Sequence, residues 1–211
     1  MVRDSPPRRI RVMTQSIMKD EKIRSLLHAS KSAGPLKVGF LLVPNFSMLA
    51  FSCAIEPLRA ANRMAGQELF SWVIAGLSGN KIDASNSVTV TTDGGPEMLQ
   101  ECRLVFACSG LDVKSQSTRE TLNIIRRLDR NGSIVGAICT GTYLMAAAGL
   151  LDERRCTIHW ENIDGLAEEF PHLEITNELF EIDDSRITCS GGTASLDMVL
   201  YLISQVHGQT L

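Results

Sequence analysis

The feature that most constrains the fold is a repeated alternation between short, continuous apolar runs and segments with helical spacing. The run KVGFLLV begins at Lys37, and FSWVIAGLS, CRLVFACSG and SIVGAI follow it along the chain. Apolar runs that are rich in β-branched and aromatic residues and do not alternate with polar ones are typical of strands buried on both faces. Alternation of such strands with helices predicts right-handed βαβ units and a mostly parallel sheet.

The segments between these runs complete the pattern. FSMLAFSCAIEPLRAANRM has helical spacing, and QSTRETLNIIRRLDRNG is an amphipathic helix that ends at Asn-Gly. SVTVTTDGG alternates like a strand that runs into a turn. RCTIHW, NELFEID and RITCSGG supply further strands, and TASLDMVLYLISQVHG a final helix. We therefore expect an α/β fold, a flavodoxin-like three-layer sandwich with helices on both faces of a mostly parallel sheet.

The first 34 residues differ from the rest in charge. They carry eight Lys and Arg against three acids, so the net charge of −3 leaves about −8 on the remainder, which is a poor surface for nucleic acid. Residues 1–34 lack a sustained hydrophobic period and end at a Gly-Pro break, so we expect a basic, disordered extension before one domain at 35–208. An organelle transit peptide, or a true start at Met18, are the alternatives.

Cysteine and histidine usage argues against disulfides and metals. The six cysteines form no CxxC pair, and the N-terminus has no apolar secretory segment, which predicts reduced thiols in a cytoplasmic protein. The four histidines lie far apart, so we expect no metal site and no cofactor. No apolar run is long enough to cross a bilayer, which predicts a soluble protein without a membrane partner.

One cysteine occupies a special position. In VGAICTGTYLMAAAGLL, residues 135–151, a buried strand turns into a helix of small residues at Cys139, which is the geometry of a nucleophile elbow. The helix start is expected to lower the pKa of the Cys139 thiol, and the Thr140 N–H to form half of an oxyanion site. Ser109 and Gly110, which end a neighbouring strand, would supply the other half in the crevice of an open α/β sheet.

The segment GAICTGTYLMAAAGLLDERRCTIHWE resembles the elbow of PfpI/ThiJ-like proteins, which share the class I glutamine amidotransferase-like fold. More narrowly, VGFLLVPNFSMLAFSCAIEPLRAANRM, CRLVFACSG and ITCSGGTASLDMVLYLISQVHG are similar to the N-terminal domain of GlxA-type AraC-family transcriptional regulators. The resemblance runs from about Leu36 to Gly208. It implies a ligand-sensing domain that dimerises and binds a small metabolite near Cys139. Members of that family respond to amino acids and quaternary amines such as arginine, carnitine or betaine.

The same resemblance implies the partners of the chain. These are a small-molecule effector, a second copy in a homodimer, and DNA through a C-terminal region. The chain stops at HGQTL, where residues 209–211 would begin the linker to that region. We therefore expect neither a helix-turn-helix nor sequence-specific DNA binding in these residues.

A catalytic thiolate needs a base, or an acid hydrogen-bonded to the sulfur. The resembling peptidases have a histidine directly after the cysteine, where this chain has Thr140, and the hydratases have an acid on the first helix, where it has Ala50. Glu56 is the only acid on that helix and comes about 1.7 turns later, on a different face. His159, at the end of the predicted strand CTIH, is the remaining candidate base, with an anchoring structural role as its alternative.

Three functions remain open at this stage. The favoured one is the sensor domain, because the elbow lacks an evident proton carrier; the alternative is a cysteine-dependent hydrolase or hydratase, such as an isocyanide hydratase. The third is a redox sensor with an exposed, low-pKa thiol. Asn45 is expected at the pocket rim or as a helix cap with Ser47, and Glu56 in the pocket or paired with Arg59. The expected ligand-binding residues are Asn45, Glu56, Ser109, Gly110, Cys139, Thr140 and His159, of which Cys139 and His159 are the candidate catalytic residues.

Overall fold

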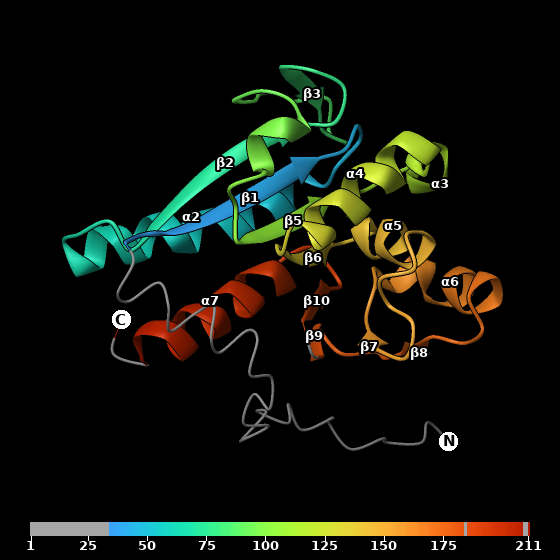
Figure 1. The fold of residues 1–211 in the computed structure, drawn as a ribbon. Coiled ribbons are helices and arrows are strands. Elements are labelled where there is room, and N and C mark those ends of the chain that lie inside the picture. The colour runs from blue at the N-terminus through green and yellow to red at the C-terminus, as the bar shows by residue number, and fades with distance from the viewer. Residues whose placement is uncertain (1–33, 184, 209–210) are drawn as a thin grey trace, which may run out of the picture.

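A computed structural model describes residues 34–183, 185–208 and 211. The expected extension at 1–34 and linker at 209–211 fall outside these residues, except for Gly34 and Leu211. Six strands form one sheet in the order β2-β1-β5-β6-β10-β9, and helices cover both of its faces (Figure 1). The sheet strands are β1 (Leu36–Leu42), β2 (Phe70–Gly76), β5 (Leu104–Cys108), β6 (Ile134–Ile138), β9 (Phe180–Asp183) and β10 (Arg186–Cys189).

The predicted parallel sheet is confirmed. β1 pairs in parallel with both β2 and β5, β5 with β6, and β6 with β10, whereas the edge strand β9 is antiparallel to β10. Every residue of β5 and β6 is buried, as expected for strands covered on both faces. Because the sheet order reverses direction at β1, the carboxyl ends of β1 and β5 flank a topological switch point, where open α/β sheets bind ligands.

The hydrophobic core has two layers, one on each face of the sheet. Along β1, Phe40 faces the layer that packs against α2 (Met48–Ala65) and α7 (Ala194–His207), and the next residue, Leu41, faces the opposite layer. That second layer contains the buried sides of α4 (Arg119–Arg130) and α5 (Gly141–Ala147). The three-layer arrangement therefore follows from the two-residue period of the strands.

Helix ends match the sequence signals closely. The Ser47 hydroxyl caps α2 by accepting from the Ala50 N–H at 3.3 Å, and Thr118 caps α4 by accepting from the Thr121 N–H at 3.2 Å. The α4 helix ends before Asn131, as the Asn-Gly signal predicts. Asn45, the other predicted cap of α2, precedes the capping residue and has a left-handed conformation with φ +62°.

Two predicted strands are shorter than expected and lie outside the main sheet. β4 (Thr89–Thr91) pairs with β3 (Lys81–Asp83), and β7 (Arg155–Cys156) pairs with β8 (Glu174–Ile175). The prediction that the strand CTIH continues to His159 is wrong. After Cys156 the Thr157 N–H donates to the Thr188 side chain at 3.0 Å rather than to a strand, and the chain then turns.

Four short helical elements had no counterpart in the sequence pattern. They are η1 (Pro96–Leu99), α3 (Val113–Gln116), η2 (Trp160–Asn162) and α6 (Ile163–Glu169). Each is at most seven residues long, which is too short for a helical period to emerge from the sequence. Among the described residues, no helix is long and apolar enough to cross a membrane, and no group of three or more His, Cys, Asp or Glu side chains could hold a metal ion.

Candidate functional site

Cys139 occupies the turn between β6 and α5, as the elbow motif predicts. Its φ of +60° lies in the left-handed region, which costs a residue with a side chain roughly 1–2 kcal/mol. The Cys139 N–H donates to the Cys189 carbonyl at 3.0 Å, so the turn is fixed to β10. The side chain is 5% exposed. The chain thus maintains a strained backbone in order to hold this sulfur at the carboxyl end of the sheet.

Two glycines allow the elbow to pack this closely. A Cβ atom on Gly141 would lie 2.1 Å from the Ala107 carbonyl oxygen, so no larger residue fits at the start of α5. A Cβ atom on Gly191, which follows β10 with φ +86°, would lie 2.7 Å from the Cβ of Cys139 and 3.0 Å from its sulfur. Sequence reasoning missed Gly191 as a site residue, although the Ser-Gly-Gly that follows β10 was a usable signal.

The environment of the sulfur corrects the prediction of a lowered pKa. Burial raises the pKa of the Cys139 thiol to about 11, because desolvation disfavours the thiolate. The Thr140 backbone N–H hydrogen-bonds the sulfur and lowers the pKa, but less than burial raises it, and the Glu161 carboxylate raises it further. At pH 7 the thiol is therefore protonated. The exposed, low-pKa thiol that a redox sensor needs is not what the structure describes.

Ser109, Gly110 and Thr140 come together beside Cys139, because β5 and β6 are paired in parallel up to Cys108 and Ile138. The Thr140 hydroxyl donates to the Gly110 carbonyl at 2.6 Å. The Ser109 side chain is 1% exposed, and its hydroxyl has no hydrogen-bond partner among the described residues. A buried hydroxyl without a partner costs free energy and is uncommon in a folded protein.

Asn45 frames the same end of the sheet through its backbone. Its N–H donates to the Asp83 carbonyl at 2.9 Å, and its carbonyl accepts from the Leu111 N–H at 3.0 Å. The Ser47 N–H in turn donates to the Ser109 carbonyl at 3.4 Å. The loop after β1 is therefore joined to the loop after β5, which carries Ser109 and Gly110.

His159 lies in the loop before η2 rather than at the end of a strand. Its Nδ1 is 3.7 Å from a Glu161 carboxylate oxygen, and its ring centroid is 5.8 Å from that of Trp160. Trp160 is 71% exposed, which is unusual for an indole. Among the described residues, neither an imidazole nor a carboxylate is hydrogen-bonded to the Cys139 sulfur. Trp160 and Glu161 begin η2 directly after His159, and sequence reasoning did not select them, although the motif HWE contains both.

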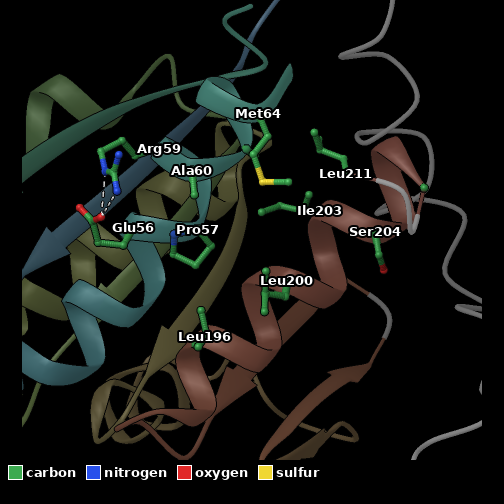
Figure 2. Close-up of a pocket in the computed structure, with 12 residues that line it drawn as sticks. Glu56, Pro57, Arg59, Ala60, Met64, Leu196, Leu200, Ile203, Ser204 and Leu211 are labelled. Carbon is green, nitrogen blue, oxygen red and sulfur yellow. Dashed lines mark hydrogen bonds and ion pairs between the residues drawn. The ribbon is translucent and has the colours of Figure 1, made fainter. Parts of the chain in front are cut away.

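The structure does not bring Glu56 to this group. Its carboxylate pairs with Arg59 at 2.7 Å, one of the two alternatives expected from the sequence, and this pairing lowers the pKa of Glu56. Both residues line a cavity of about 450 Å³ between α2 and α7 (Figure 2). The position expected to hold a catalytic acid in an enzyme, Ala50, is fully buried on α2.

Comparison with known proteins supports the resemblance seen in the sequence. The DJ-1/PfpI family model matches residues 37–205. The chain is 46% identical over 172 residues to the HTH-type transcriptional regulator CdhR of Pseudomonas aeruginosa, covering 82% of this chain and 51% of the regulator. It is 38% identical over 181 residues to the HTH-type transcriptional regulator GlxA of Rhizobium meliloti, covering 85% of this chain and 56% of GlxA. The chain thus spans about half the length of these curated relatives.

A solved structure and a curated enzyme complete the comparison. An AraC family transcriptional regulator from Pseudomonas putida superposes with a TM-score of 0.76 at 25% identity, covering 83% of this chain and 95% of that one. Isonitrile hydratase of Pseudomonas putida is 32% identical over 89 residues, which is 42% of this chain and 38% of the hydratase. The regulators therefore match a larger part of this chain than the hydratase does.

Proposed function

Since the chain belongs to the DJ-1/PfpI family, we propose that it is the effector-binding and dimerisation domain of a transcriptional regulator of the AraC family. The observation that carries this proposal is the state of the Cys139 thiol. It occupies a nucleophile elbow, yet burial raises its pKa to about 11, and the hydrogen bond to its sulfur comes from the Thr140 backbone N–H. A sulfur held in this way contributes shape and weak polarity to a pocket rather than a nucleophile.

The floor of the proposed effector site is small and polar. Ser109 and Cys139 lie side by side at the carboxyl ends of β5 and β6, and the Ser109 hydroxyl still has both its donor and its acceptors available. An effector group that hydrogen-bonds to this hydroxyl would satisfy a buried polar atom that has no partner in the free protein. Binding energy gained in this way discriminates strongly between ligands that carry a hydrogen-bonding group and ligands that lack it.

The rim of the site favours a cation. Trp160 presents an exposed indole, and Glu161 places a carboxylate close enough to act electrostatically on Cys139. A quaternary amine or alkylammonium is attracted both by the face of an indole and by a carboxylate. The proposed effector is therefore a small metabolite of the amino acid or quaternary amine type, with its cationic group at Trp160 and Glu161.

DNA binding is assigned to the part of such a regulator that lies outside the residues matched here. The chain covers about half of CdhR and GlxA, and both are named as HTH-type regulators. A helix-turn-helix contacts DNA through a recognition helix in the major groove and commonly binds as a dimer. In this proposal the chain acts in the cytoplasm, receives the effector and holds two copies together. The six free thiols are consistent with that compartment.

Calorimetric titration of the chain with arginine, carnitine and glycine betaine tests the effector site. At least one of them should bind, and at a concentration of 100 times its Kd it should stabilise the fold by about 2.7 kcal/mol. Trp160→Ala and Glu161→Gln should each weaken binding by roughly tenfold. Glu168→Gln, which removes an exposed carboxylate from the neighbouring helix α6, is the matched control and should bind normally.

A cysteine-dependent enzyme is the second candidate, because the left-handed elbow at Cys139 and the 32% identity to isonitrile hydratase both favour it. Incubation with an alkyl isonitrile separates the two functions. Turnover that Cys139→Ala abolishes, combined with no binding of any cationic metabolite, would replace the sensor proposal with the enzyme. Binding without turnover would support the sensor.

A further inference from the structure

A cluster of three polar side chains joins the helices that follow the loops of the proposed effector site. The Glu169 carboxylate, at the last residue of α6, accepts a hydrogen bond from the Tyr143 hydroxyl and pairs with the Lys114 ammonium at 2.7 Å. The Lys114 ammonium also lies 5.6 Å from the centre of the Tyr143 ring. We call these three residues the Glu169 cluster. The helices that it joins, α3, α5 and α6, lie next to one another in Figure 1.

Lys114 and Tyr143 lie on the helices that follow the floor of the site. α3, which carries Lys114, begins three residues after Gly110, and α5, which carries Tyr143, begins two residues after Cys139. The Tyr143 N–H donates to the Thr140 carbonyl at 2.9 Å, so the position of Tyr143 follows from that of the elbow. Both partners of Glu169 therefore belong to the two loop–helix units that form the floor.

Glu169 belongs to the helical segment that carries the rim. This segment is η2 followed directly by α6; it begins at Trp160, includes Glu161 as its second residue and ends at Glu169. α6 has seven residues and one buried side chain, Leu166. A helix this short is not stable by itself, so its orientation depends on the contacts that it makes with the rest of the fold. The contacts of Glu169 fix the end of the segment opposite to the rim.

The contacts of Glu169 are stronger than those of an ordinary surface ion pair. The side chains of Lys114 and Glu169 are 66% and 39% exposed, and a pair of this kind contributes little by itself. The same carboxylate, however, accepts from the hydroxyl of Tyr143, which is buried and packs edge-on against the ring of Phe170. A hydrogen bond to a charged group is worth more than one between neutral groups. Both contacts lower the pKa of Glu169, so the carboxylate is ionised at neutral pH.

We infer that Glu169 is a positioning residue of the effector site, which holds the rim formed by Trp160 and Glu161 in place beside the floor formed by Ser109 and Cys139. The inference rests on the proposed function, because it assigns this role toward a rim that the effector would contact. Glu169 itself does not touch the effector. Without its contacts the segment from η2 to α6 would move as a unit, and a bound cation would lose the indole and the carboxylate of the rim together. A rim that is fixed before binding reduces the entropy that binding costs.

The motion of the rim is measured first, without any effector. The chain has two tryptophans, so Trp72→Phe leaves Trp160 as the single fluorophore of the full 211-residue chain. In this background Glu169→Ala should increase the amplitude of the nanosecond motion of Trp160 in time-resolved fluorescence anisotropy. Glu168→Ala is the matched control. It removes the preceding carboxylate of α6, which has no ion pair among the described residues, and should leave the anisotropy unchanged. Circular dichroism establishes that all variants are folded.

The effect on binding is measured by calorimetric titration with arginine, carnitine and glycine betaine. Whichever of them binds the wild-type chain should bind Glu169→Ala at least about threefold more weakly, whereas Glu168→Ala should bind normally. Lys114→Glu and Glu169→Lys should each weaken binding to a similar extent, because each places like charges side by side. The double variant restores an opposite-charge pair, and the Tyr143 hydroxyl can accept from an ammonium, so it should recover most of the affinity.

The outcomes separate the inference from the proposal beneath it. If none of the three metabolites binds the wild type but Trp160 moves more in Glu169→Ala, the effector proposal is overturned and the positioning of the rim is supported. If Glu169→Ala binds normally, or if its Trp160 moves no more than in the control, the inference is overturned and the effector site stands. Weaker binding, a more mobile Trp160 and recovery in the double variant are the expected results. A loss of global stability alone would produce neither the local change at Trp160 nor the recovery.

Discussion

Gly191 lies directly against Cys139, although the two residues belong to different strand–turn segments. A single methyl group on Gly191 would lie 2.7 Å from the Cβ of Cys139, closer than carbon atoms approach without displacement. The contact covers the sulfur from the β10 side. It therefore contributes to the burial that raises the pKa of the thiol, and it couples the shape of the elbow to the Gly-Gly turn before α7.

Gly191→Ala should destabilise the protein by about 2–3 kcal/mol, because the new methyl group overpacks the elbow and the residue has φ +86°. Gly192→Ala is the matched control. It also has a positive φ, +57°, but a Cβ there would meet no atom within 4 Å, so only backbone strain of about 1 kcal/mol is expected. Urea denaturation measures both. Equal losses for the two variants would show that the Gly191–Cys139 contact is not tight.

Ser109→Ala should leave the stability unchanged or raise it by up to about 1 kcal/mol, because it removes a buried hydroxyl that has no partner. Ser133→Ala provides the contrast. Ser133 is also buried, but its hydroxyl donates to the Cys102 carbonyl at 2.8 Å, so its loss should cost about 1 kcal/mol. Thermal unfolding without effector compares the two variants. A Ser109→Ala variant as unstable as Ser133→Ala would mean that Ser109 is already hydrogen-bonded in solution.

The main sheet could be predicted because its signal is local. Each of the apolar runs that form β1, β2, β5 and β6 predicts a strand from its own residues alone. The strand around Thr157 could not be predicted in the same way. The Thr157 N–H donates to the hydroxyl of Thr188, which lies 31 residues away in the sequence. The residue that ends the strand early therefore cannot be identified from the segment itself.

The same distinction divides the candidate site. Cys139, Thr140, Ser109 and Gly110 follow directly from strand ends and the elbow motif, and the structure brings them together. The pKa of the thiol does not follow, because it depends on burial by segments from other parts of the chain. The start of α5, a helix of seven residues, therefore does not lower the pKa of the Cys139 thiol as much as desolvation raises it.

Alkylation of Cys139 by iodoacetamide should be slow at neutral pH and should accelerate as the pH rises toward 11, because the thiolate is the reactive form and burial raises the pKa to about 11. Mass spectrometry after a timed pulse follows each cysteine separately. Cys53, the one cysteine that is not fully buried, is the internal comparison and should be modified first. Rapid and selective modification of Cys139 at pH 7 would instead indicate an activated nucleophile.

The unfolding free energy should decrease as the pH rises above about 9. Burial raises the pKa of Cys102 to about 11 in the folded chain, whereas the unfolded thiol titrates near 9.0. Between these two pH values the folded chain keeps the thiol proton that the unfolded chain loses. A raised folded pKa contributes stability that is complete below the unfolded pKa and is lost as the pH passes through the folded one. For one such thiol the loss is about 2 kcal/mol by pH 11. Urea denaturation at pH 8 to 11 under reducing conditions measures the slope, and Cys102→Ala should make it shallower. An unfolding free energy that stays constant over this pH range would contradict the burial of the Cys102 thiol.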